Sequence, residues 1–279
     1  MSILLCVEFN VQPYLQNASS NTIHIMWETS SGYESIVEYG LDETLGSSDT
    51  GSSFSSNGSN IIHDVQLSGL VPSTRYYYRV TTSDAISDIF NFITPPLQTD
   101  ESSFKLIAMS DMQIDYSNAN KFSEIVHDGV IDYLSDYYTS DISDELAFIL
   151  TPGDLVENGN SYYQWAEHFF GPSHPLFAYS PLYPVLGNHE NNTNNYFEYF
   201  HLPENGSNGY MEHWWYFDYS NTRIIGLDSN SGYQIQTQLN WLDDVLEDAC
   251  TNNLIDFLFV QLHHPYLSEL WIAGETIIL

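Results

Sequence analysis

The chain has 279 residues, of which 43% are hydrophobic and 15% aromatic. This composition supplies a packed core and excludes wholesale disorder. With 37 acidic and five basic residues, the net charge is −32 at pH 7. Such a surplus of negative charge repels nucleic acid and anionic lipid, which excludes binding of either through a basic patch. No run of about 18 apolar residues occurs, so we expect no membrane span.

The beginning of the chain and its cysteines carry little information. Residues 1–7 are apolar, but they are too short for a signal peptide and lack a positively charged start. They are either the remnant of such a peptide or a first strand. Cys6 and Cys250 lie far apart in the sequence, and a single pair cannot define a disulfide framework. We expect both to be buried as small hydrophobic residues.

Residues 8–94 are predicted to form a β-sandwich. Ile23, Ile25 and Trp27 alternate with polar residues, as in a strand with one buried face. Further strands are expected at residues 35–39, 61–67, 75–82 and 88–94. Gly-, Ser- and Asn-rich segments separate them, and the longest, residues 46–60, is expected to be a flexible turn.

A linker at residues 95–103, with two prolines and a polar run, separates this region from a second pattern. From residue 104 to residue 279, apolar runs of strand length alternate with helical periods, which predicts an α/β domain. The expected strands are residues 104–109, 146–150, 182–186, 214–219, 223–227 and 254–262. The expected helices are residues 118–138 and 235–250.

Residue types that commonly bind metals are found where these predicted strands end. Asp111 and Gln113 follow the first strand, Asp154 follows the second, Asn188-His189-Glu190 follows the third, and His263-His264 follows the last. Ligand sites in open α/β sheets form beyond the carboxyl ends of strands. An Asp after a strand is by itself most often a turn residue. A turn that presents an amide, an imidazole and a carboxylate together is rare by chance. Oxygen ligands mixed with imidazole suit Mn, Fe or Zn.

The order of these motifs resembles the calcineurin-like metallophosphoesterase superfamily. The sequence at residues 67–80, with Tyr76–Tyr78, resembles a turn and strand of fibronectin type III-like domains, and residues 238–242 resemble a helical segment of the family. A β-sandwich followed by such a domain is most similar to the purple acid phosphatases. The implied fold is a β-sandwich followed by a two-sheet α/β domain flanked by helices. The resemblance also implies export to the periplasm or the extracellular space.

The resemblance implies a centre of two divalent or mixed-valence transition metals, Fe, Mn or Zn. Asp111 would bind the first metal, and Asp154 would bridge both, because a carboxylate offers two oxygens. Asn188 and His263 would bind the second metal. Gln113 stands where the family has a histidine, and it either binds through its carbonyl oxygen or forms a hydrogen bond.

The implied reaction is hydrolysis of a small-molecule phosphate ester, most often a monoester, by a metal-activated hydroxide. His189 would stabilise the transition state or protonate the leaving group. Glu190 would support the site rather than bind metal, and His264 would be a neighbour of the metal ligands or of the substrate. Glu157 stands where purple acid phosphatases carry their metal-binding tyrosine, so a coloured ferric centre is not implied.

No histidine follows His264, whereas the family ends with a G-H-x-H motif. We therefore expect a truncated domain whose metals bind more weakly and whose apolar surface is partly uncovered. The alternative to an enzyme is a binding or adhesion module that works through the β-sandwich, with a decayed α/β scaffold. For the β-sandwich itself, Trp27 and Tyr76–Tyr78 favour a spacer with an apolar core over a carbohydrate- or partner-binding module. The sequence does not indicate an oligomeric state.

Overall fold

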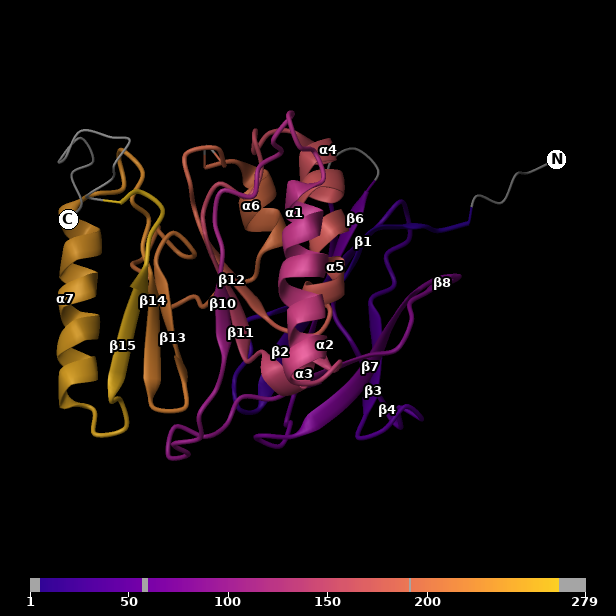
Figure 1. Ribbon diagram of the computed structural model, residues 1–279, viewed down its shortest axis with the longest axis horizontal. Coiled ribbons are helices and arrows are strands. Elements are labelled where there is room, and N and C mark those ends of the chain that lie inside the picture. Colours follow the sequence, from indigo (N-terminus) through magenta and orange to yellow (C-terminus); the bar gives the residue numbers. More distant parts are fainter. Residues whose placement is uncertain (1–5, 57–59, 191, 266–279) are drawn as a thin grey trace.

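The computed structural model describes residues 6–56, 60–190 and 192–265, which form a β-rich N-terminal part and an α/β C-terminal part (Figure 1). The β-rich part lies at one end of the molecule, and the last helix, α7, lies at the other. This arrangement confirms the predicted combination of a β-sandwich and an α/β domain.

Two antiparallel sheets build the N-terminal part. The first contains, in order, β1 (Phe9–Gln16), β2 (Thr22–Thr29), β6 (Ile61–Ser68) and β5 (Ser52–Ser55). The second contains β4 (Ser47–Thr50), β3 (Ile36–Gly40), β7 (Arg75–Thr82) and β8 (Ala85–Ile86), and β9 (Phe90–Ile93) pairs with β7. Because side chains alternate between the two faces of a strand, one face of each sheet fills the core between them. Trp27 and Tyr78 are fully buried there.

Two expectations were wrong, and one strand was missed. The segment 46–60 is not only a turn, because β4 pairs with β3 and β5 pairs with β6; its polar Ser-rich sequence suits strands that are mostly exposed. Strand β1 was not predicted, because bulges interrupt its regular alternation. Cys6 and Cys250 are exposed rather than buried. Neither cysteine lies at a core position, so the apolar character of cysteine was not sufficient to predict burial.

The α/β part contains two further sheets. One is parallel, with β10 (Leu106–Ala108), β11 (Phe148–Pro152) and β12 (Leu182–Val185) in that order. The other contains β13 (Trp215–Tyr219), β14 (Thr222–Gly226) and β15 (Phe257–Gln261). The helical segments are α1 (Lys121–Glu124), η1 (Ile125–Ile131), α2 (Asp132–Tyr137), α3 (Ile142–Glu145), α4 (Tyr162–Gln164), η2 (Trp165–Phe170), α5 (Gly171–Phe177), α6 (Asn194–Tyr199) and α7 (Gln236–Thr251).

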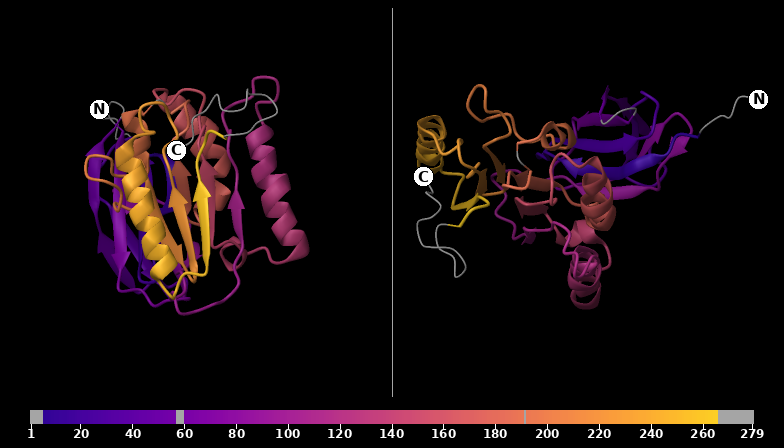
Figure 2. Two further views of the ribbon diagram at one scale, coloured as in Figure 1. Left: turned by 90° about the vertical axis from the view of Figure 1, so that its left-hand side faces the viewer. Right: turned by 90° about the horizontal axis from the view of Figure 1, so that it is seen from above.

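Aromatic side chains join these two sheets. The rings of Tyr183 on β12 and Phe217 on β13 stack with their centroids 3.9 Å apart. The amide of Gln261 on β15 donates a hydrogen bond to the carbonyl of Tyr183 at 3.0 Å. Helix α7 covers the outer side of the second sheet, as two views show (Figures 1 and 2). The sheets therefore adjoin one another, and the carboxyl ends of β11, β12 and β15 lead into neighbouring loops.

The first predicted helix is continuous over α1, η1 and α2 but is not a regular α-helix. Its middle segment, η1, is π-helical. A π turn contains an extra residue, which rotates the side chains away from the stripe that an α-helical period predicts. Phe122, Val126 and Leu134 are buried as expected, whereas Ile125 is 45% exposed. The second predicted helix corresponds closely to α7.

The N-terminal part packs tightly against the α/β part. Val11, Tyr14 and Met26 of the first sheet belong to the same buried cluster as residues of η2 and β12. The Tyr14 hydroxyl donates to the carbonyl of Tyr199 at 2.6 Å, and both groups are buried. A shared core of this kind opposes relative motion of the two parts.

Strand β15 exposes apolar side chains, among them Phe257 and Phe259, which are 57% and 54% exposed. The apolar run that leads to Leu279 lies outside the described residues, which end at residue 265. The predicted domain limits at residues 94 and 104 remain predictions. Among helices within the described ranges, none combines the length and apolar character needed to cross a bilayer.

Candidate metal centre

The loops after β10 and β11 hold Asp111 and Asp154 side by side. Both residues have a positive φ, 57° for Asp111 and 56° for Asp154. This left-handed region is uncommon for residues other than glycine, and such strain is often found at functional sites. The amide of Asp111 donates to the carbonyl of Gly153 at 3.2 Å, and the amide of Met112 donates to the carbonyl of Asp154 at 2.9 Å. The two turns are thus connected through their backbones.

His263, Asn188 and Asp154 direct atoms with lone pairs at one another. The His263 Nδ1 lies 2.9 Å from the carbonyl oxygen of Pro152, which can only accept, so Nδ1 carries the proton. A neutral His263 ring then has its lone pair on Nε2, which lies 3.2 Å from Asn188 Oδ1 and 3.3 Å from Asp154 Oδ2. Three acceptors this close require a proton or a cation among them.

The electrostatics of His263 agree with this requirement. Burial alone would lower the pKa of the His263 imidazole, but the facing Asp154 carboxylate raises it above its usual value. The pKa of Asp154 is lowered: burial would raise it, but the hydrogen bonds from His263 and the His189 amide outweigh burial. The arrangement therefore favours positive charge between these groups.

Asp111 adds a further ligand atom at the same place. One ligand atom each of Asp111, Asp154 and His263 lies within 4.8 Å of the others. The Gln113 carbonyl oxygen is buried and has no hydrogen-bond partner among the described residues. A buried acceptor without a donor is costly, and an ordered water or a cation would satisfy it. Carboxylate and amide oxygens together with imidazole form a donor set suited to Mn, Fe or Zn.

Glu190 lies beneath this site and does not face it. Its carboxylate accepts hydrogen bonds from the backbone amides of Asp154 at 2.9 Å, Leu155 at 2.8 Å and Gly187 at 2.7 Å. Burial and the charge of Asp154 raise the pKa of Glu190, while these donors oppose that shift. Glu190 therefore connects the turn after β11 with the turn after β12.

Gly187 permits these two turns to approach each other. A Cβ atom at this position would lie 2.2 Å from Asp154 Oδ1 and 2.3 Å from the Asp154 amide nitrogen. No side chain fits at such distances. The glycine that precedes Asn188 is thus required by close packing against the candidate bridging carboxylate.

His189 lies at the edge of the site. Its Nδ1 lies 2.7 Å from the Glu157 carbonyl oxygen, which assigns the proton to Nδ1 and directs Nε2 inward, 3.7 Å from Asp154 Oδ2. Burial alone would lower the pKa of His189, but the Glu157 carbonyl and the nearby Asp154 charge raise it. His189 is therefore positioned to hold a proton beside Asp154.

His264 and the loop after β14 complete the surroundings. The His264 Nδ1 lies 2.9 Å from Ser229 Oγ. The Asn230 side-chain amide donates to the carbonyls of Leu186 and Gly187, at 3.2 and 3.3 Å. This support was missed in the sequence, although residues 228–230 follow a predicted strand and so carry the same positional signal as the other motifs.

Buried Gln238 on α7 holds that loop in place. Its carbonyl oxygen accepts from the Asp228 amide at 2.9 Å, and its amide donates to the carbonyls of Asp228 and Tyr233, at 3.0 and 2.8 Å. Gln238, in the helical Gln-x-x-Trp-Leu segment, thus holds Asp228. Asp228 in turn accepts a hydrogen bond from Asn230, which supports the Gly187–Asn188 turn.

Family models match both parts of the chain. Residues 9–94 match the N-terminal domain of purple acid phosphatases, and residues 104–279 match the calcineurin-like phosphoesterase model. The second match covers more than half of the chain. The chain belongs to the calcineurin-like phosphoesterase family. Together with the N-terminal match, this confirms the purple acid phosphatase-like resemblance.

Related proteins include plant purple acid phosphatases. Purple acid phosphatase 15 of Arabidopsis thaliana is 26% identical over 231 residues, which are 76% of this chain and 43% of the relative. Purple acid phosphatase 13 of the same plant is 26% identical over 216 residues, 67% of this chain and 40% of the relative. This phosphoesterase-family chain thus spans less than half the length of these relatives.

Solved structures support the fold. Purple acid phosphatase PPD1 from yellow lupin (Lupinus luteus) has a TM-score of 0.69 at 15% identity and covers 92% of this chain and 51% of its own. The structure of PhoD has a TM-score of 0.60 at 12% identity and covers 90% of this chain and 61% of its own. At these identities the likeness concerns the fold alone.

Proposed function

We propose that this chain carries the metal-binding part of a phosphoester hydrolase, with phosphate monoesters as its substrate class. The observation that chiefly supports the proposal is the position of His263 Nε2. This atom lies 3.2 Å from Asn188 Oδ1 and 3.3 Å from Asp154 Oδ2. Membership of the phosphoesterase family supplies the class of reaction.

The proposed ligands divide between two metal ions. Asp111 and Gln113 would hold the first, Asn188 and His263 the second, and Asp154 would bridge them. Metals bound there would supply a water of lowered pKa and neutralise the charge that develops on the phosphoryl group. They would also offset the repulsion between an anionic ester and a chain of net charge −32.

The protein's own groups position the substrate and move a proton. His189 Nε2, directed inward by the Glu157 carbonyl, would donate a proton to the leaving oxygen or a hydrogen bond to the phosphoryl group. Glu190 would keep Asp154 oriented through the backbone of its loop. A cavity of about 160 Å³ beside Asp111 would admit a small ester, and its wall contains Lys121 and Phe122 as well as the carboxylates of Asp115 and Glu167. Export from the cell is part of the same proposal.

The test compares hydrolysis of 4-nitrophenyl phosphate and its diester by the chain and by any longer natural form, with Mn²⁺ or Zn²⁺ added. We expect metal-dependent hydrolysis, faster for the monoester, and its loss in Asp154→Asn. Bound metal is quantified in parallel. If a longer form binds two metals per chain and hydrolyses neither ester, the proposal is wrong, and a binding module becomes the better interpretation.

A further inference from the structure

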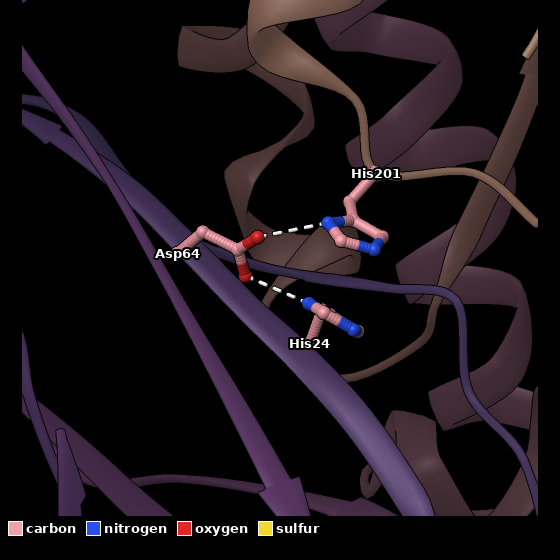
Figure 3. Close-up of side chains that lie close together, drawn as sticks. All are labelled: His24, Asp64 and His201. Carbon is pink, nitrogen blue, oxygen red and sulfur yellow. Dashed lines mark hydrogen bonds and ion pairs between the residues drawn. The ribbon is translucent and has the colours of Figure 1, made fainter. Parts of the chain in front are cut away.

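A second group of metal-binding side chains lies between the β-sandwich and the α/β part. It consists of His24 on β2, Asp64 on β6 and His201, which follows α6 (Figure 3). Asp64 Oδ1 lies 2.8 Å from His24 Nδ1, and Asp64 Oδ2 lies 2.8 Å from His201 Nδ1. None of these residues belongs to the candidate metal centre.

The strand register places His24 and Asp64 on the same face of their sheet. His24 pairs with Gln66, and Met26 pairs with Asp64, so His24 and Asp64 are diagonal neighbours. Their neighbours Ile25 and Val65 point to the opposite face, into the sandwich core, whereas Met26 packs against the α/β part. Both side chains therefore face the adjoining domain and not the core of their own.

His201 lies opposite them and comes from the α/β part, where it follows α6. Its backbone amide donates to the side-chain oxygen Oε1 of Gln16, at the end of β1 in the sandwich, at 3.3 Å. Its ring stacks on the His24 ring, with centroids 3.6 Å apart and planes inclined by 25°. The two imidazoles are thus fixed side by side, and Figure 3 shows both directed at the single Asp64 carboxylate.

The surroundings favour a cation. Burial alone would raise the pKa of Asp64, but the two imidazoles lower it to about 2, so the carboxylate is charged. Glu204 and Glu212 add negative potential at His201. Among the described residues, the ion pairs of Arg and Lys side chains are formed with carboxylates other than that of Asp64. Two imidazoles and a carboxylate form a frequent donor set for Zn²⁺ and similar ions.

We infer that His24, Asp64 and His201 form a structural site for a divalent transition metal, with Zn²⁺ as the representative ion, that fastens the β-sandwich to the α/β part. In this site the ion takes the place of the two Nδ1 protons that now join the rings to Asp64. A neutral ring then carries its proton on Nε2, and a protonated ring releases one proton to solvent. Bonds of about 2.0–2.1 Å separate neighbouring tetrahedral ligand atoms by about 3.3 Å. Each Asp64 oxygen and the ring nitrogen it now faces at 2.8 Å would therefore move apart by about half an ångström.

Zinc is measured in the Asp154→Asn chain, because this substitution impairs the candidate metal centre. Zinc retained after gel filtration is compared with and without His24→Gln, and His127→Gln serves as the control because His127 is exposed on η1 and outside both groups. We expect His24→Gln to lose one zinc equivalent and His127→Gln to lose none. Equal zinc contents in the two variants would overturn the inference and leave a hydrogen-bonded contact.

A second measurement uses a chain that keeps His24, Asp64 and His201, so its result does not depend on whether the His24→Gln variant folds. In the Asp154→Asn chain with ¹⁵N-labelled histidine, stoichiometric Zn²⁺ should shift the Nδ1 resonances of His24 and His201. These resonances are assigned by single substitutions at His24 and His201. If zinc shifts only the resonances of His263 and His189, the ion binds at the other centre and the proposed site does not exist.

Discussion

The carboxylate of Glu190 accepts a hydrogen bond from the backbone amide of Asp154 at 2.9 Å, and it also holds the amides of Leu155 and Gly187. One buried side chain thus determines how the turns after β11 and β12 lie relative to each other. This relationship makes Glu190 a positioning residue for the candidate bridging carboxylate, although it contributes no ligand atom.

Replacing Glu190 with glutamine should disturb that relationship. The side-chain amide would direct N–H groups at backbone N–H donors, leaving at least one buried donor unsatisfied. We expect metal affinity to fall about 10- to 100-fold, as for other changes behind metal ligands. Calorimetric titration with Mn²⁺ measures this, and Glu247→Gln on the exposed side of α7 is the control. Equal affinities in the two variants would contradict the positioning role.

The close approach of Gly187 to Asp154 predicts a steric effect. In Gly187→Ala the new methyl group would lie 2.2 Å from Asp154 Oδ1, so the turn or the carboxylate must move. We expect loss of metal binding and a destabilisation of about 1–3 kcal/mol. Gly46→Ala is the matched control, because no atom lies within 4 Å of its added Cβ. Denaturant unfolding and metal titration measure the two effects, and a Gly187→Ala chain that behaves like Gly46→Ala would refute the packing argument.

The buried Gln113 carbonyl predicts a gain on substitution. If this oxygen is a metal ligand, Gln113→His supplies an imidazole, which binds Mn, Fe or Zn more strongly than an amide oxygen does. We expect metal affinity to rise on the order of tenfold. Competition against a chelator of known affinity measures the change. Unchanged affinity would assign Gln113 to a hydrogen-bonding role instead.

Glu28 predicts a pH-dependent contribution to stability. This fully buried carboxylate accepts hydrogen bonds from the hydroxyls of Tyr162 and Tyr199, both at 2.7 Å. Burial raises the pKa of Glu28 above its ordinary value of 4.5, and these hydrogen bonds oppose the shift. Because the folded state holds the proton more tightly, this group's contribution is fully present below pH 4.5 and is lost as pH rises through the raised pKa.

Tyr199→Phe removes one donor and should raise the pKa of Glu28 further. We expect a destabilisation of about 1–3 kcal/mol at neutral pH and a smaller one below pH 4.5, where the carboxyl is protonated in both states. Tyr163→Phe, at a side chain that is 62% exposed, should change little at either pH. Urea unfolding at both pH values tests this, and a loss independent of pH would contradict it.

Local pattern was sufficient for much of the fold and the candidate site. The strands before Asp111, Asp154 and Asn188 are apolar runs whose length and termination are local properties, so their positions could be predicted. Strand β1 and the π-helical segment η1 could not, because bulges and π turns break the periodicity that reveals regular elements.

The sequence by itself determined which residues end the strands, and through their order it indicated the family and its chemistry. Only the tertiary structure decided that His24 and Asp64 meet His201 from the other domain, 137 residues beyond Asp64. It also decided that Glu190 joins two turns and that Gln238 supports a third. The physical reason is that strand ends follow from local periodicity, whereas these contacts depend on long-range strand register and domain packing, which no short segment specifies.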